Sequence, residues 1–438
     1  MTGSGLSAQF GMVAEVYTNE VQQLSGTPSA TFGLNFDGAL TTITLSTTAT
    51  APQIQAALEA LPNIGTGGVV CAGGALPAAV TVTFSGALVS KRNVPLLAVQ
   101  GAVTGLTFAT NTPGTGYGDA VTVTRFLEIA VESMKLDIDR IESKALRAGN
   151  RATRTDRWAA GRRQAAGDLS FELGSKGFGL PLGQCFGVDP VVTTPSGATS
   201  TRDQTFTVTT SDNANRSFTA QIGTPDVDGT VQPFTYKGAK VVDWEITMEN
   251  DGLGMLKMGT DAQDEATSIA LASASYASSF ELLYFSGGQM SIGGALVDAR
   301  KVSLKGKMSY ATDRFFLRTS TTAGGATLKK EPIANDFMEI TGELEVEFSA
   351  LTHYNRFVNG TLAQIVFAFQ GSIIEAGGGA TINPRFGLTI TLPNCRFDGE
   401  TPDVKGPDIV PITLPFKALY DGSTSVFVAV YRSTDTVQ

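Results

Sequence analysis

Two segments of the chain alternate polar and apolar side chains in nearly the same way. Residues 167–173 read Gly-Asp-Leu-Ser-Phe-Glu-Leu, and residues 342–348 read Gly-Glu-Leu-Glu-Val-Glu-Phe. A period of two is typical of a half-buried β-strand, which places its carboxylates on one face and its apolar side chains on the other. The pattern therefore predicts the same strand twice, and with it a duplicated sheet.

The repeat continues on both sides of these strands and keeps its order. Residues 133–139 alternate as residues 301–307 do, and residues 238–243 resemble residues 393–398. The separation between the copies varies, as expected when loops differ in length while strands persist. A short segment with helical character follows the central strand of each copy, at residues 178–186 and 352–358.

Residues 21–117 interrupt this scheme with a segment rich in Gly, Ala and Thr. Asp37-Gly38 between two alternating runs predicts a β-hairpin, and Thr50 with Pro52 begins a short helix. Strands follow at residues 80–84 and 96–99. We expect a small ββαββ domain inserted into a first domain made of residues 1–20 and 118–275, with a second domain at residues 276–438. The alternative is one continuous first domain without an insertion.

Composition supports many short strands. The 438 residues include 49 glycines, are 42% hydrophobic and only 17% charged, which favours strands and turns over long solvated helices. We therefore expect a mainly β protein with more than one domain.

Charge and cysteine content exclude several classes. A net charge of −9 argues against a surface built as a whole to grip nucleic acid. Cys71, Cys185 and Cys395 form no CxxC pair, so neither a disulfide framework nor a zinc site is predicted. A signal peptide and a membrane-spanning run are not recognisable, so we expect a soluble protein made in a cytoplasm.

Catalytic motifs are not recognisable. His353 is the one histidine of the sequence, and GxSxG, HExxH and P-loop motifs do not occur. The glycines at 177, 179 and 183 have the wrong spacing for a dinucleotide loop. Carboxylates on one stripe of a strand cannot flank a scissile bond. We expect no enzyme activity, no catalytic residue, no cofactor and no metal.

The most basic stretch lies between the first two strand blocks of the first copy. Its cations are Arg140, Lys144, Arg147, Arg151, Arg154, Arg157, Arg162 and Arg163. A counterpart loop spans residues 312–336 of the second copy. Long ordered loops are commonly functional. A solvated loop, a contact to an acidic protein and a contact to nucleic acid all stay open.

Residues 124–187 resemble a known family. Its features here are Thr124-Arg125-Phe126-Leu127-Glu128-Ile129, Leu136 to Ser143, Leu146 to Gly149, Asp156 to Ala159 and Gly177-Phe178-Gly179. They are similar to the tail tube (major tail) proteins of long-tailed phages, especially those of actinobacterial hosts. The resemblance covers residues 1–20 and 118–438, and residues 21–117 resemble small ββαββ modules of phage structural proteins.

The resemblance implies a fold and an assembly. Each tube domain would be a β-sandwich with a short helix, whose inner strands join those of its neighbours in a ring-shaped barrel. Family rings commonly hold six tube domains, so two per chain imply a trimer with pseudo-sixfold symmetry, with a hexamer as the alternative. Stacked rings would form the conduit for the genome, in a virion tail assembled in the host cytoplasm. Implied partners are the tape measure, terminator and tip proteins and, transiently, DNA, with no membrane.

Two hypotheses concern surfaces. The carboxylates of the repeated strands would line the lumen and repel the DNA backbone, namely Asp168, Glu172, Glu343, Glu345 and Glu347. The basic stretch would join one ring or subunit to the next. Competing functions are a tail-tip adhesion or carbohydrate-binding protein that uses the insert, and a DNA-binding protein that uses the basic stretch.

Overall fold

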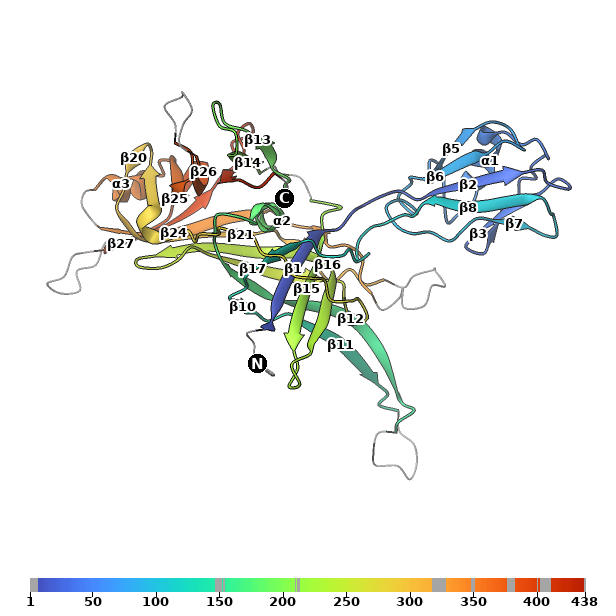
Figure 1. Ribbon diagram of the computed structural model, residues 1–438, viewed down its shortest axis with the longest axis horizontal. Coiled ribbons are helices and arrows are strands. Elements are labelled where there is room, and N and C mark those ends of the chain that lie inside the picture. Colours follow the sequence, from blue (N-terminus) through green and yellow to red (C-terminus); the bar gives the residue numbers. More distant parts are fainter. Residues whose placement is uncertain are drawn as a thin grey trace. The chain divides into compact units, whose positions relative to one another are not determined.

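A computed structural model (Figure 1) describes the chain in ten stretches. They are residues 7–145, 152, 154–208, 210, 213–316, 328–347, 351–375, 383–399, 401 and 411–436. The protein is mainly β, with 48% strand and 7% helix, which confirms the predicted fold class. Described residues 15–121 form one compact unit, here the small unit, and the other described residues form the large unit.

The small unit contains one helix and seven strands in its described residues. They are β2 (Val21–Gly26), β3 (Gly33–Phe36), β4 (Ala39–Leu40), α1 (Ala51–Glu59), β5 (Val69–Gly73), β6 (Val80–Phe84), β7 (Ala98–Gln100) and β8 (Leu106–Thr112). The strands form a sheet of order β5-β6-β2-β8 and a sheet of order β4-β3-β7. The expected hairpin turns at Asp37 and Gly38, whose φ angles are 47° and 81°. Strands β2, β5 and β8 are present in addition to the four strands of the predicted ββαββ domain.

The large unit has two halves. The first half comprises β1 (Gln9–Ala14), β9 (Arg125–Leu127), β10 (Val131–Glu132), β11 (Lys135–Glu142), β12 (Trp158–Glu172), α2 (Gly179–Phe186), β13 (Val191–Thr193), β14 (Arg202–Thr207), β15 (Phe218–Pro225), β16 (Val231–Glu249), β17 (Met255–Ala262) and β18 (Asp264–Ala266). The repeated strand at residues 167–173 is the end of β12, and the expected helical segment after it is α2.

The second half follows the same plan. It comprises the 3₁₀ turn η2 (Phe285–Gly287), β19 (Gly288–Ile292), β20 (Ala295–Leu296), β21 (Ala299–Lys307), β22 (Tyr310–Ala311), β23 (Ile333–Ala334), β24 (Glu339–Glu347), α3 (Thr352–Asn359), β25 (Ala363–Ile373), β26 (Arg385–Phe397), β27 (Pro411–Ala418) and β28 (Val428–Ser433). The second copy of the repeated strand is β24, and α3 is the expected helical segment after it.

Strand order is the same in both halves. Antiparallel pairing gives β11-β12-β17-β16 in the first half and β21-β24-β27-β26 in the second. Strand β16 also pairs through its N-terminal part with β15, and β26 pairs along most of its length with β25. The halves join edge to edge, because β16 pairs with β21 from Asp243↔Lys307 to Glu249↔Lys301. One sheet therefore runs through both halves.

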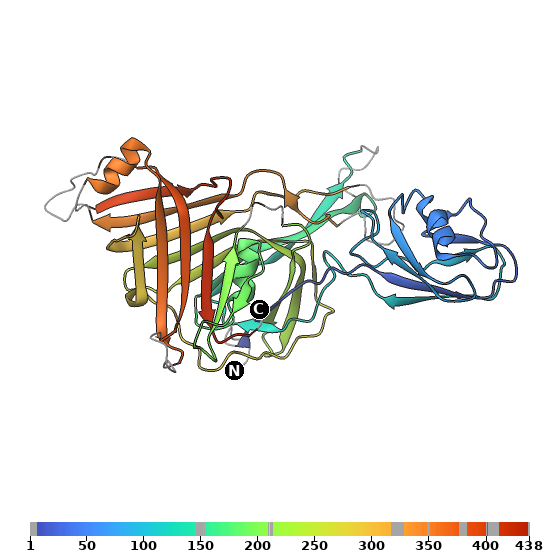
Figure 2. The same cartoon turned by 90° about the horizontal axis from the view of Figure 1, so that it is seen from above.

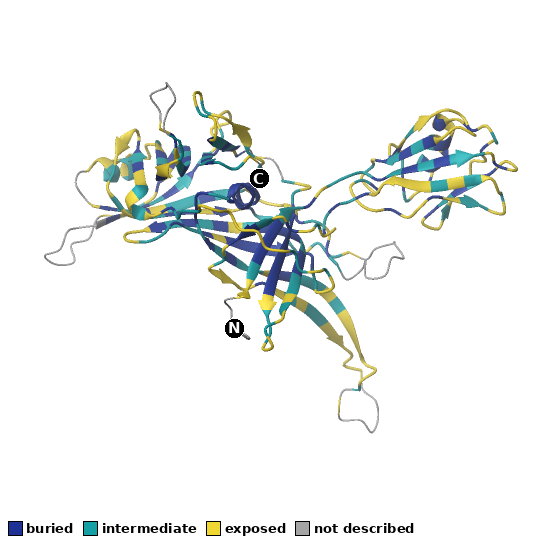
Figure 3. Cartoon of the chain, viewed as in Figure 1, coloured by how far each residue is buried: buried dark blue, intermediate teal, exposed yellow. Residues whose placement is uncertain are grey.

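A shared core lies along this seam. Trp244 of β16 and Gly306 of β21 face each other, and a Cβ on Gly306 would lie 2.3 Å from the indole, so a side chain does not fit there. Helix α2 is buried at all eight residues, as Figure 3 shows in dark blue. Its Phe186 ring packs 5.1 Å from Trp244 and 5.0 Å from Phe427 of the second half. The helix thus fills the seam between the halves.

Candidate functional site

The predicted carboxylates lie on one face of the continuous sheet. Leu169 and Phe171 of β12 are fully buried, so Asp168 and Glu172 point to the opposite face. In β24, Leu344 and Val346 are buried in the same way. Strands β12, β17, β16, β21 and β24 are paired side by side, and directly opposite residues lie on the same face of the sheet. Glu343, Glu345 and Glu347 therefore lie on the same face as Asp168. We call this the charged face.

Lysines from the intervening strands lie among these carboxylates. Lys257 of β17 pairs with Asp168 at 2.8 Å, and Lys301 of β21 pairs with Glu249 of β16 at 2.6 Å. Lys305 lies 3.2 Å from Glu245. The predicted carboxylates therefore do not form a uniformly negative wall, and whether they line a lumen stays a prediction. The charged face is a mosaic of ion pairs in which a strand rich in acid lies beside a strand rich in lysine.

This arrangement shifts several pKa values on the charged face, among them those of Lys257 and Asp243. The hydrogen bond from Lys257 to Asp168 raises the pKa of the lysine ammonium. Burial raises the pKa of the Asp243 carboxyl, and the nearby charge of Asp168 adds to the rise. The carboxylate of Asp168 thus contributes to both shifts, as hydrogen-bond partner of Lys257 and as a neighbouring charge of Asp243.

Part of the charged face is covered by the counterpart loop of the second half. Lys329 is buried there in an ion pair with Asp261 of β17. Lys240 of β16 donates to Glu331 at 2.8 Å and to the Pro332 carbonyl at 3.0 Å. Because buried charges are tolerated when paired, these contacts fix the loop against the sheet. Arg318, another cation of this loop, lies outside the described residues.

The basic stretch forms a two-stranded arm. Strands β11 and β12 pair out to Glu142↔Trp158, and Figure 1 shows them extending from the rest of the large unit. Of the predicted cations, Arg140 belongs to β11, and Arg162 and Arg163 belong to β12. Lys144, Arg154 and Arg157 lie in the connection, whereas Arg147 and Arg151 lie outside the described residues.

Three of the arm's arginines form ion pairs within the chain. Arg154 pairs with Asp156 at 2.8 Å in the connection. Arg163 is ion-paired with Asp264 and donates to the Glu265 carbonyl at 3.0 Å. Arg162 pairs with Asp139 at 2.9 Å. Arg163 therefore joins the base of the arm to the segment around Asp264, and the role of the eight cations as one contact surface stays a prediction.

The outer part of the arm combines cations with exposed apolar side chains. Ile141 and Trp158 are 61% and 53% exposed, and the Arg140 guanidinium lies 5.5 Å from the centre of the Trp158 ring. Apolar groups held in water beside cations are typical of a protein contact. The prediction from charge alone did not include these two side chains.

A family model described as phage tail tube protein matches residues 95–418, most of the chain. The chain belongs to the phage tail tube protein family. The match begins just before β7 of the small unit and covers the large unit from β9 to the end of β27, so β1 and β28 lie outside it. No match was found among curated proteins. Membership assigns a structural role in the virion tail through self-assembly into a tube, and this is not a family of enzymes.

The histidine and two of the cysteines of this tail tube protein have pKa values shifted by burial. Burial lowers the pKa of His353, and nearby Arg356 lowers it further. Burial raises the pKa of the Cys71 and Cys395 thiols to about 12. The described residues contain no group of three or more His, Cys, Asp or Glu side chains that could hold a metal ion. In the same part of the chain, helices are too short or too polar to cross a membrane.

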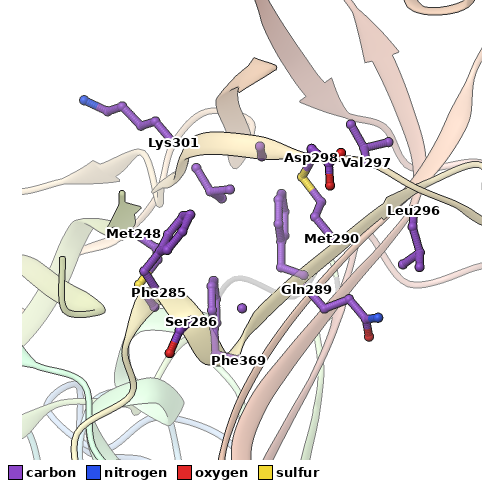
Figure 4. A pocket seen from close by; sticks show the side chains of 14 residues that line it. Met248, Phe285, Ser286, Gln289, Met290, Leu296, Val297, Asp298, Lys301 and Phe369 are labelled. Atoms are coloured by element: carbon purple, nitrogen blue, oxygen red, sulfur yellow. The ribbon is translucent and has the colours of Figure 1, made fainter. Parts of the chain in front are cut away.

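An apolar hollow of the tail tube protein lies beside the seam (Figure 4). It has a volume of about 420 Å³, and Phe285, Met290 and Phe369 of the second half line it together with Met248 of β16. Asp298 and Lys301 are the charged residues of its lining. The lining lacks the converging polar groups of a catalytic pocket.

Proposed function

We propose that this chain forms the tail tube of a long-tailed phage from rings of three chains. Each half of the large unit supplies one tube domain, so that three chains give a ring with pseudo-sixfold symmetry. The observation that carries the proposal is the strand order common to both halves and their edge-to-edge pairing through β16 and β21. A chain that already joins two domains in this way needs fewer separate junctions to close a ring.

The charged face is proposed to line the lumen. Its carboxylates keep the phosphate backbone of DNA at a distance, and the interleaved lysines form ion pairs with three carboxylates of this face, those of Asp168, Glu249 and Glu245. Lysines held in such pairs offer DNA few sites at which to bind tightly. Genome delivery through this lumen, and contact with the tape measure, terminator and tip proteins, belong to the same proposal.

The arm and the small unit are assigned to other surfaces of the tube. The arm, with Trp158, Ile141 and its outer cations, is proposed to contact the adjacent ring. The small unit is proposed to be an inserted domain outside the tube. Assembly is proposed to take place in the cytoplasm of the host.

Electron microscopy of the purified protein tests the proposal. We expect stacked rings whose outline has six lobes, with native mass spectrometry of single rings giving three chains. A map with the charged face on the outer wall would contradict the lumen assignment. Rings of six chains would refute the trimer, and protein that stays monomeric at all salt and protein concentrations would refute the assembly.

A further inference from the structure

The seam inside one chain consists of a strand pair and a buried helix. Strand β16 pairs with β21, which places Asp243 opposite Lys307 on the charged face. On the other side of the sheet, α2 packs its Phe186 against Phe427 of the second half. The first half thus contributes β16 and α2 to the seam, and the second half contributes β21 and Phe427.

The strand registers show which residues occupy the same positions in both halves. Asp243 pairs with Gly259, which pairs with Asp168. In the second half the Asp398 N–H donates to the Pro415 carbonyl, and Pro415 pairs with Glu343. Asp168 and Glu343 belong to the two copies of the repeated strand. Asp398 of the second half is therefore equivalent to Asp243 of the first.

Strands β21 and β11 also have equivalent residues in the two halves. Lys307 pairs with Glu339 of β24. In the first half, Asp137 pairs with Gln164 of β12, which lies as far before Asp168 as Glu339 lies before Glu343. Asp137 of β11 is therefore equivalent to Lys307 of β21.

The equivalents of the seam elements, the second edge of β11 and the helix α3, are not covered by other parts of the described chain. Among the described residues, β11 pairs with β12 along one edge and has no strand along the other, whereas β21 has β24 and β16. Helix α3 has no buried residue, whereas α2 is buried throughout. Leu351, Val358 and Leu362 in and beside α3 are 58%, 58% and 46% exposed. Figure 2 shows α3 at the outer end of the second half and α2 near the middle of the large unit.

We propose that a second copy of this chain covers both boundaries by repeating the internal seam. The α3 side of one chain, with the end of β26, docks on the β11 edge of the next chain. Asp398 then lies opposite Asp137 of the neighbouring copy, and the exposed side chains of α3 become buried as those of α2 are. Arg396, which pairs with Asp398 at 2.9 Å, offsets the repulsion between the two carboxylates. This inference rests on the proposed ring assembly and names its contact surfaces.

Disulfide cross-linking tests the register. In the double variant Asp137→Cys and Asp398→Cys, mild oxidation of assembled rings is expected to join neighbouring chains, with a closed covalent product of three chains on non-reducing gels. Each single variant, and the pair Ile141→Cys and Asp398→Cys, provides a control. Ile141 is four residues further along β11, about 13 Å away, so that pair should not join. The native cysteines give little background because their raised pKa values disfavour the thiolate.

Two outcomes separate this inference from the proposed function. If the wild-type chain forms no rings, the proposed function is wrong. If the wild type forms rings but the Asp137→Cys and Asp398→Cys pair joins no more than the Ile141→Cys control pair, the ring proposal stands and this junction is wrong.

Charge substitution on α3 gives a second test. The variant Leu351→Asp with Val358→Asp should remain monomeric and unfold at the wild-type temperature, because both side chains are exposed in the single chain. Leu40→Asp changes a leucine of the small unit that is 49% exposed, and it should assemble as the wild type does. Wild-type ring formation by the α3 variant would overturn the inference.

Discussion

Glu375 shows how a single half-buried side chain can tie the two halves together. Its carboxylate accepts hydrogen bonds from the Thr201 hydroxyl at 2.7 Å and from the Thr199 hydroxyl at 2.8 Å, as well as from backbone N–H groups of residues 199–201. These bonds join the segment after β25 to the turn before β14. The Thr201 hydroxyl, with these other donors, lowers the pKa of Glu375 to about 2 from its ordinary 4.5.

This pKa predicts a pH dependence of stability. Because the folded-state pKa is depressed, the contribution of Glu375 is present above pH 4.5 and is lost as the pH falls toward 2. Glu375→Gln should therefore lower the unfolding temperature at pH 7 and converge with the wild type near pH 2. Thermal unfolding of both proteins between pH 2 and pH 7 measures this difference in unfolding temperature. A difference that does not change with pH would contradict the assignment.

At the same scale, the sequence predicted the acids of the charged face but not their partners. Asp168 and Glu343 belong to alternating runs, which a period of two identifies locally. Lys257 lies 89 positions from Asp168 along the chain, and only strand pairing brings them together. Local periodicity gives the face of a strand, whereas the composition of the whole face depends on which distant strands lie beside it.

The arm predicts different effects for two of its arginines. Arg157 in the connection is exposed, whereas Arg163 is ion-paired with Asp264. Reversing the outer charges with Lys144→Glu and Arg157→Glu should prevent stacking of rings while leaving the unfolding temperature unchanged. Arg163→Glu should instead destabilise the subunit, because it places two carboxylates side by side. Sedimentation for assembly and thermal unfolding for stability separate the two effects; tubes from the outer variant would refute the contact.

Element positions were predicted best where the signal is local. The helix after each repeated strand and the helix capped by Thr50 are present, because turns, caps and apolar spacing belong to neighbouring residues. The burial of α2 and the exposure of α3 were not predicted, since both depend on the seam. The repeat itself was aligned two residues out of register upstream. Ser133 was matched with Lys301, but the pairings Ser133–Asp168 and Ser303↔Glu343 make Ser303 its equivalent.

For the whole molecule, the small unit should be dispensable for folding of the large unit. Thr18 and Thr115 form a hydrogen-bonded pair, with N···O distances of 3.0 and 3.1 Å, so the chain enters and leaves this segment at adjacent points. Contacts on the other side of that pair remain after excision, including the Gly118 N–H to Glu15 carboxylate bond and the pairing of β1 with β15. A two-residue Asn-Gly turn has the geometry to join such a pair.

We therefore expect a variant in which Asn-Gly replaces residues 19–114 to fold and to form rings. Circular dichroism and thermal unfolding measure the fold, and electron microscopy measures assembly. Residues 18–115 expressed alone provide the complementary test, because their own core around Phe36 and Phe84 should sustain a cooperative transition. An excised chain that folds but forms no rings would place the small unit in the wall of the tube. An excised chain that does not fold would show that the first tube domain is continuous, since an inserted domain contributes its own core and leaves that of its host intact.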